Sequence, residues 1–376
     1  MNSFIRFTTG ILLFVSAIFS AQAAFTNLYV FGDGISTTTN NPSTGPLYYG
    51  KRYSNGRVWV EVLAQRQGLG ANSITNVNWS YSTNNWSYFY NSSTTMLANV
   101  SSFQAPSNAS NALFVIWVNC ADLWFPATYS GTSMSQWTSA INQAQTNHYN
   151  AVTSLYAKGA RALIMPNAVD VSTIPAFNKS ENVNFIHLRC LDYNIAFSNT
   201  LNRIRASCPN LTLYTPDFFT LLANMLAHPA NYGLTNALCG GLSIDAVDAK
   251  SCNSTYPSAA TNGFGTNLIF WDEQDPTAMV HAWMANTAQQ LISQPRISQI
   301  TALAGSNRLV MANVPAGQYG QVLGRTNLLL GNWTTNMLSN GTNTFATTNT
   351  TQTVYVTNSG PQRFYRLKFL YSWTWP

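Results

Sequence analysis

Charged side chains are scarce in this sequence: Asp, Glu, Lys and Arg together make up 8% of its 376 residues. The formal net charge is +6, and the basic residues are scattered except for a cluster near the end of the chain, Arg363, Arg366 and Lys368. A stripe of Lys and Arg with interleaved aromatic residues, the pattern typical of nucleic-acid-binding proteins, is therefore missing. The sequence predicts no nucleic-acid partner, and its abundant Asn, Ser and Thr indicate a surface made polar by amides and hydroxyls.

Long uncharged apolar runs are missing after the first 24 residues. Met1–Ala24 has the pattern of a secretory signal peptide: Arg6 precedes an apolar core at Ile11–Phe19, and Ala21-Gln22-Ala23 supplies a small-residue cleavage site. A membrane anchor is the alternative, but this apolar core is shorter than the roughly 20 residues that a spanning helix needs. We therefore expect an exported protein, secreted or periplasmic, with no membrane span once the signal peptide is removed.

Histidine and cysteine are also few, and no CxxC or Cys/His cluster has the spacing of a zinc site. The sequence therefore predicts neither a metal nor a cofactor. Five cysteines leave at least one unpaired. Cys239 and Cys252 bracket a loop rich in Gly, Ser and Asn, which makes them the first candidates for a disulfide.

Apolar segments of strand and helix character alternate from residue 27 to residue 291. Short apolar runs predict buried strands at 27–30, 112–117, 160–166 and 211–216. Apolar residues at helical spacing predict helices at 58–67, 136–158, 182–207, 217–227 and 276–291, with Asp217 capping the fourth. This alternation is typical of an α/β fold with a doubly wound parallel sheet and flanking helices.

The pattern changes at about Ile297 to short alternating segments separated by Asn, Gly and Thr. Six strands are predicted, at 308–314, 319–325, 333–338, 342–347, 352–357 and 363–370. They favour a small C-terminal antiparallel β-sandwich. We therefore divide the chain into a signal peptide (1–24), an α/β domain (25–296) and a C-terminal module (297–376). Trp333, Trp373 and Trp375 suggest that the module binds carbohydrate or attaches to a surface, and a purely stabilising role is the alternative.

Several blocks in the first domain resemble, in order and spacing, the GDSL/SGNH family of secreted lipases and esterases. They are Phe31-Gly32-Asp33-Gly34, the run from Ser54 to Ala64, Pro166-Asn167 with Pro175-Ala176-Phe177, the run from Asn231 to Asn236, and the run from Phe270 to Thr277. The resemblance covers about residues 28–291. It implies a flavodoxin-like α/β sandwich and the hydrolysis of carboxylic esters by a Ser-His-Asp site.

The residues at the family's chemical positions differ from that pattern. The resemblance places Gly34 where the family has its serine nucleophile, a position whose backbone N–H also serves the oxyanion. Ser82 and Ala121 replace the glycine and the asparagine that supply the other oxyanion donors. Asp275 replaces the general-base histidine, while Asp272 keeps the triad acid. The sequence thus predicts a degenerate site that binds a glycan, an acylated polymer or a partner. An active ester hydrolase with a non-standard arrangement is the alternative.

Two other residues are candidate substitutes for the missing groups. Ser36 is the nearest hydroxyl to the vacant nucleophile position, and Asn119 lies two residues before the missing asparagine. The acidic residues of the site blocks either recruit a hard cation such as calcium or accept hydrogen bonds from backbone amides; these are Asp33, Asp122, Asp272, Glu273 and Asp275. His281 lies too far along its helix to replace the histidine missing at position 275, which favours a packing role.

Overall fold

The computed structural model describes residues 25–38, 48–50, 52–67, 69, 84–234, 267–315, 318–327, 333–347, 351–357 and 364–370. The expected signal peptide and the Cys239–Cys252 pair lie outside these residues, as do Ser82, Trp373 and Trp375. Within the described residues, none of the helices has both the length and the apolar character needed to cross a bilayer.

The first part of the chain is built on four parallel strands in the order β1-β2-β3-β4. They are β1 (Leu28–Gly32), β2 (Leu113–Trp117), β3 (Ala162–Ile164) and β4 (Thr212–Tyr214). Every residue of β1, β2 and β3 is buried. Both faces of these strands are covered, which is why they read as continuous apolar runs instead of alternating ones.

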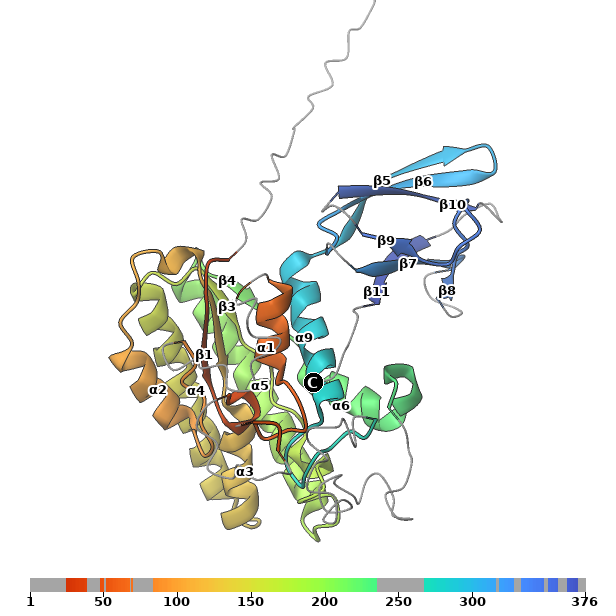
Figure 1. The fold of residues 1–376 in the computed structure, drawn as a ribbon. Helices are drawn as coiled ribbons and strands as arrows, with labels where there is room; N and C mark the ends of the chain where they lie inside the picture. The colour runs from red at the N-terminus through yellow and green to blue at the C-terminus, as the bar shows by residue number, and fades with distance from the viewer. Residues whose placement is uncertain are drawn as a thin grey trace, which may run out of the picture.

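Helices cover the sheet on two sides (Figure 1). α2 (Ser93–Ser102) packs on α4 (Met134–Ala157), which packs on α5 (Val183–Ser207). α1 (Trp59–Arg66) packs on α9 (Ala278–Ser293), on the other side of the sheet in Figure 1. The remaining helices are α3 (Asn119–Tyr129) and α6 (Phe218–Ala227). The predicted α/β fold with a parallel sheet and flanking helices is therefore confirmed.

A predicted local signal is present at the start of α6, whereas α3 has none that the sequence revealed. The Asp217 side chain accepts a hydrogen bond from the Thr220 N–H at 3.0 Å, so the predicted cap of α6 is confirmed. α3 was not predicted from the sequence, because it contains Pro126, which lacks a backbone donor and ordinarily ends a helix. α3 begins two residues after β2 ends, and it carries Cys120 and Ala121 to the carboxyl edge of the sheet.

The C-terminal part forms two antiparallel sheets, so the predicted β architecture is confirmed. One sheet has the order β10-β6-β5, and the other has the order β11-β7-β8 with β9 also paired to β7. The strands are β5 (Arg296–Leu303), β6 (Ser306–Ala312), β7 (Tyr319–Arg325), β8 (Thr334–Thr335), β9 (Phe345–Ala346), β10 (Thr351–Thr357) and β11 (Phe364–Leu370). They enclose a separate core that includes Leu309, Met311, Val322, Val356 and Phe369.

Two details of this β region differ from the expectation. β5 was missed because most of its side chains are partly or fully exposed, so it lacks a clean alternation of apolar and polar residues. The strands expected at 333–338 and 342–347 shrink to the two-residue strands β8 and β9. The boundary at residue 296 stays a prediction, and it falls at the junction between α9 and β5.

Candidate functional site

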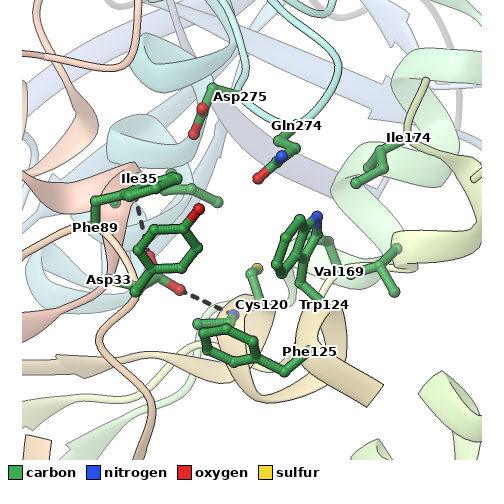
Figure 2. Close-up of a pocket in the computed structure, with 14 residues that line it drawn as sticks. Asp33, Ile35, Phe89, Cys120, Trp124, Phe125, Val169, Ile174, Gln274 and Asp275 are labelled. Atoms are coloured by element: carbon green, nitrogen blue, oxygen red, sulfur yellow. Dashed lines mark hydrogen bonds between the residues drawn. The ribbon is translucent and has the colours of Figure 1, made fainter. Parts of the chain in front are cut away.

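The candidate site begins where β1 ends. Asp33 follows the strand, and its Oδ1 accepts a hydrogen bond from the Ile35 N–H at 3.2 Å, which caps the short 3₁₀ helix Gly34–Ser36. Its Oδ2 accepts from the Ala121 N–H in α3 at 3.3 Å (Figure 2). One carboxyl group therefore joins the loop after β1 to the helix after β2. The carboxyl edge of a parallel sheet is where such folds place their ligands.

A glycine is required beside this junction. A Cβ on Gly32 would lie 2.6 Å from Ser87 Oγ and 2.9 Å from Ser36 Cβ, closer than packed atoms approach. Gly34 differs, because a Cβ there would meet Phe89 Cδ2 at 3.4 Å and Tyr53 Cδ2 at 3.6 Å, which are ordinary contacts. Gly32 is therefore needed for packing, whereas position 34 has room for a small side chain.

A cavity open to solvent lies beside this junction, with about 570 Å³ of space when the open solvent is included, and Gly34 is one of its lining residues. Figure 2 shows the side chains around it. Five segments line it, and the lining residues are Asp33, Gly34, Ile35, Phe89, Tyr90, Cys120, Ala121, Trp124, Phe125, Val169, Val171, Ile174, Gln274 and Asp275. Gly34, Ala121 and Asp275, which the resemblance assigned to three different chemical positions, thus face one cavity. The structure brings these three predicted site residues together.

Aromatic rings form one wall of the cavity. The Tyr90 ring centroid lies 6.2 Å from that of Trp124 and 5.8 Å from that of Phe125. Phe89, which also packs on Tyr53, completes this wall. Sequence reasoning missed these residues, although the run of aromatics at 86–90 and the Leu-Trp-Phe triplet at 123–125 were visible signals. The wall suits acyl groups and the apolar faces of sugar rings.

A second cavity adjoins the first, with about 420 Å³ of space when open solvent is included. The two share Ile35, Val169, Ile174 and Gln274, and every other residue lining the second is apolar. It extends toward α6 and α9, where Phe218, Leu222, Met225, Val280 and Met284 line it. Gln274 is therefore the polar side chain at the boundary between the open cavity and an apolar chamber.

Burial changes the acid-base behaviour of the groups around the cavity. Asp33 is 2% exposed, and this burial raises the pKa of its carboxyl group to about 7, although its backbone hydrogen bonds oppose the shift. Desolvation likewise raises the pKa of Asp122 to about 6. Burial, together with the charge of Asp33, raises the pKa of the Cys120 thiol well above its ordinary value. Cys120 is therefore a protonated thiol at neutral pH, and the thiolate is the nucleophilic form.

Asp272, the residue at the triad-acid position, supports the turn that carries Asp275. Its Oδ1 accepts from the N–H groups of Gln274 at 2.9 Å and Asp275 at 2.7 Å. Its Oδ2 accepts from the Tyr48 hydroxyl at 2.7 Å. Asp272 does not line the cavity among the described residues, so it acts on the site by holding Asp275 in place.

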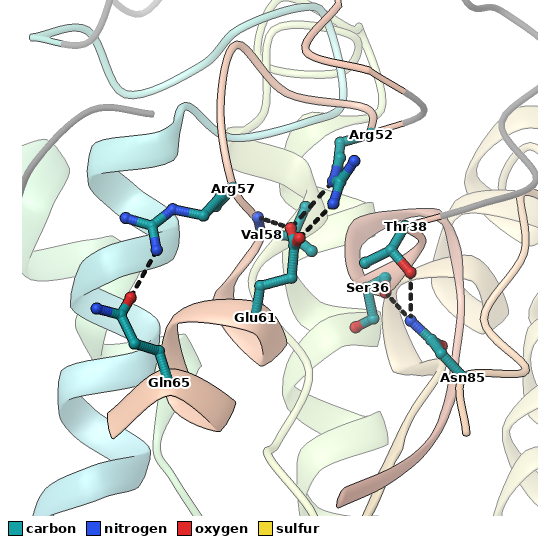
Figure 3. Close-up of polar contacts among 8 residues, drawn as sticks. All are labelled: Ser36, Thr38, Arg52, Arg57, Val58, Glu61, Gln65 and Asn85. Atoms are coloured by element: carbon teal, nitrogen blue, oxygen red, sulfur yellow. Dashed lines mark hydrogen bonds and ion pairs between the residues drawn. The ribbon is translucent and has the colours of Figure 1, made fainter. Parts of the chain in front are cut away.

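Neither proposed substitute faces the cavity in the described part of the chain. Ser36 is fully buried, and its Oγ accepts a hydrogen bond from Trp59 Nε1–H at 3.0 Å. The Asn85 side chain also donates to the Ser36 carbonyl, which ties the loop to the neighbouring segment (Figure 3). Asn119 is buried, and its side-chain N–H donates to the Pro166 carbonyl at 2.9 Å. Both side chains serve packing.

The acids and the last helix histidine also have structural partners. Asp33 and Asp272 both accept hydrogen bonds from backbone N–H groups. Of the two roles considered for these acids, calcium binding and hydrogen bonding to backbone amides, these contacts are of the second kind. No group of three His, Cys, Asp or Glu side chains within the described ranges is placed to hold a metal ion. His281 is buried, its Nδ1 accepts from the Trp59 N–H at 3.2 Å, and burial lowers its pKa to about 3. It therefore packs α9 against α1.

Residues 28–288 match the sequence profile of the family described as GDSL-like Lipase/Acylhydrolase. An acetylesterase of Thermothelomyces thermophilus is 25% identical over 266 residues, which cover 62% of this chain and 84% of that protein. A phosphatidylcholine-sterol acyltransferase of Aeromonas hydrophila is 24% identical over 323 residues, covering 72% and 91%. Among solved structures, a catalytic mutant of an acetylxylan esterase from Geobacillus stearothermophilus is 10% identical, covers 72% of this chain and 96% of that chain, and aligns with a TM-score of 0.41.

Proposed function

The chain belongs to the GDSL-like lipase/acylhydrolase family, and from this premise we propose that it is an exported binding protein whose pocket has lost ester hydrolysis. Its ligand is a glycan, an acylated polymer or an ester-bearing partner. The pocket supports this class of ligand with an aromatic wall, an adjoining apolar chamber and the polar side chains of Gln274 and Asp275. The predicted signal peptide at Met1–Ala24 supports export.

The proposal is carried by the cavity lining. Among the described residues, no serine, threonine or histidine lines it, and Gly34 and Asp275 stand where the resemblance implies a serine and a histidine. Loss of the nucleophile alone removes nearly all of the chemistry of a Ser-His-Asp site, because these residues act as a unit. As residue types, aspartate is also a much weaker base than histidine, since their unperturbed pKa values are about 4 and about 6.5.

An ester assay tests the loss of hydrolysis. We expect no turnover of p-nitrophenyl acetate, butyrate or a longer ester by the wild-type chain, and none by Gly34→Ser alone, since a serine without a base is inert at neutral pH. Gly34→Ser combined with Asp275→His supplies both groups, and position 34 has room for the new side chain. Measurable turnover is expected from this double variant only. Gly34→Ala with Asp275→His is the matched control without a hydroxyl.

The competing candidate is an active hydrolase with a non-standard arrangement. It is favoured by one observation: Cys120, a thiol, lines the same cavity as Asp275. Wild-type turnover that disappears in Cys120→Ala would establish this candidate and overturn the proposal. Ser36→Ala is expected to change nothing in the assay, because that hydroxyl is buried against Trp59.

Export has its own test. Expression in a bacterial host followed by N-terminal sequencing of the protein outside the cytoplasm should give a chain that starts at Ala24 or Phe25, after cleavage of the signal peptide. A protein found only in the cytoplasm with Met1 or Asn2 intact would contradict export and leave the pocket proposal standing.

A further inference from the structure

The C-terminal part of the chain has an unusual charge distribution. No Asp or Glu occurs after Asp275, whereas six basic residues do, and these are Arg296, Arg308, Arg325, Arg363, Arg366 and Lys368. The β region therefore carries a positive charge with no acidic residue of its own to neutralise it. A surface of this kind attracts anions over the range of a Debye length, about 8 Å at physiological salt.

Three of these side chains share the outer face of the sheet β11-β7-β8. In β11, Tyr365, Leu367 and Phe369 pack against the β core, so the alternating residues Arg366 and Lys368 face outward. In the adjacent β7, Arg325 pairs directly with Phe364, which belongs to the same outward-facing set as Arg366 and Lys368. Paired residues of antiparallel strands project from the same face. The register thus places Arg325 diagonally across from Arg366.

A tryptophan holds the two arginines together. The Arg366 guanidinium lies 4.6 Å from the centroid of the Trp333 ring, and the Arg325 guanidinium lies 5.6 Å from it. Partial burial and the neighbouring Arg325 charge lower the pKa of Arg366, yet arginine stays charged at neutral pH. Two like charges are therefore held over one aromatic ring, on a sheet face where Arg366 and Lys368 are exposed.

We propose that this face, which we name the basic face (Arg325, Trp333, Arg366 and Lys368), binds a carboxylate-bearing polysaccharide. Planar guanidinium groups bind carboxylates with two parallel hydrogen bonds, and cation–π contacts with Trp333 fix their orientation. Tyr319 and Phe364, which are 58% and 41% exposed, project from the same face and offer apolar surface to sugar rings. This inference is independent of the pocket and of whether it hydrolyses esters.

The arrangement favours a polyuronate over a nucleic acid. Proteins that bind single-stranded nucleic acid stack bases on open aromatic faces. Here the guanidinium groups of Arg325 and Arg366 lie over the ring of Trp333, the largest aromatic side chain of the face. That ring therefore orients cations and is not a stacking platform.

The ligand test uses the full chain and a matched pair of polymers. Isothermal titration calorimetry is run with polygalacturonate, with highly methyl-esterified polygalacturonate, and with an oligothymidylate as a polyanion of another class. We expect polygalacturonate to bind, its affinity to fall as NaCl is raised, and the esterified polymer, which has the same backbone without the charges, to bind at least about tenfold more weakly. No binding of polygalacturonate, equal binding of both polymers, or tighter binding of the oligothymidylate would overturn the proposal.

Variants locate the interaction on the basic face. Arg325→Gln with Arg366→Gln should weaken polygalacturonate binding at least about tenfold, and Lys368→Gln should weaken it by a smaller factor. Arg308→Gln is the matched control: it removes the same charge from β6 in the other sheet, where Leu309 and Met311 face the core and Arg308 faces away from it. It should leave the affinity unchanged. Equal losses of polygalacturonate affinity in Arg308→Gln and Lys368→Gln would show that only the net charge of the chain matters. That result would overturn the proposed site, and it does not depend on whether the Arg325→Gln, Arg366→Gln double variant folds.

Discussion

Between residues 25 and 275 the chain has eleven basic and twelve acidic residues, whereas after residue 275 it has six basic residues and no acidic one. In the α/β part, several of these charges lie inside the fold. Arg52 and Glu61 are fully buried against each other, and Glu61 also accepts from the Val58 N–H at 2.9 Å (Figure 3). In the β part, Arg366 and Lys368 lie on an exposed face.

This difference has a physical meaning. A buried charge must be compensated by a partner, so it ties loops and helices of the α/β part together and contributes to a defined geometry. An exposed charge contributes little to stability and remains available for a ligand. We therefore expect charge-removing substitutions to affect folding in the first part of the chain and binding in the second.

The largest effect is expected from Glu61→Gln. This change leaves the Arg52 charge buried without its carboxylate, and breaking one side of a buried pair costs about 3–5 kcal/mol. The free energy of unfolding should fall by that order, measured by urea denaturation followed by tryptophan fluorescence. Arg308→Gln in the β part is the control and should stay within about 0.5 kcal/mol of wild type. Similar losses of unfolding free energy in Glu61→Gln and Arg308→Gln would contradict the expected difference between the α/β part and the β part.

The pH dependence of stability tests the buried carboxyl of Asp33. Its pKa is about 7 in the folded chain, because of burial, and near 4 in an unfolded chain. At a pH between these two pKa values, Asp33 holds a proton in the folded state that it has lost in the unfolded state. The contribution of Asp33 therefore makes the free energy of unfolding fall as pH rises. His148 and His281 act in the opposite direction, because burial lowers their pKa values to about 4 and about 3.

Asp33→Asn should therefore make stability rise more steeply with pH than in the wild type. The slopes should differ by up to about 1.4 kcal/mol per pH unit between pH 4 and pH 7. Urea midpoints measured across this range give the two slopes, and a constant offset caused by the new amide does not change them. Parallel curves would mean that Asp33 is ionised in the fold at pH 5.

A smaller effect is expected from Asp217→Ala at the start of α6. The side chain caps the helix through the Thr220 N–H, and loss of such a cap costs about 1 kcal/mol. Glu181→Ala is a fitting control, because Glu181 is an exposed acidic residue that precedes α5. The control should lose less than about 0.5 kcal/mol in the same urea titration. Equal losses would show that the cap is not the stabilising contact.

The smallest effect on stability is expected from Lys368→Gln. This side chain is exposed on the basic face, so the free energy of unfolding should stay within about 0.5 kcal/mol of wild type. Polygalacturonate binding should nevertheless weaken. A loss of stability of about 1 kcal/mol or more, which is the mean for point mutations, would place Lys368 with the structural charges of the α/β part.

Much of the fold could be predicted, because burial leaves a periodic pattern in the sequence. The apolar run at 112–117 predicted β2, and β7 (Tyr319–Arg325) was predicted with both its ends. Helix α2 (Ser93–Ser102), α3 and β5 were missed, and two of these misses have identifiable causes. α3 contains Pro126 and was not expected to be helical, and β5 is largely exposed and so lacks alternation.

The site could be predicted only in part. The blocks located Gly34, Ala121 and Asp275, and the structure brings them to one cavity. The aromatic wall formed by Tyr90 and Trp124 was not found, because the two rings come from segments whose proximity no local pattern encodes. The direction in which each side chain points could not be predicted from the sequence either.

The sequence by itself determined the fold class and the residue types at the family's chemical positions, since apolar periodicity and block order are local properties of the chain. It also determined that every acidic residue precedes position 276. The tertiary structure decided which side chains face a ligand. Ser36 turns inward because the Trp59 indole needs an acceptor in the core, and Asn119 turns toward the Pro166 carbonyl. It likewise decided, through the pairing of β7 with β11, that Arg325 and Arg366 meet over Trp333.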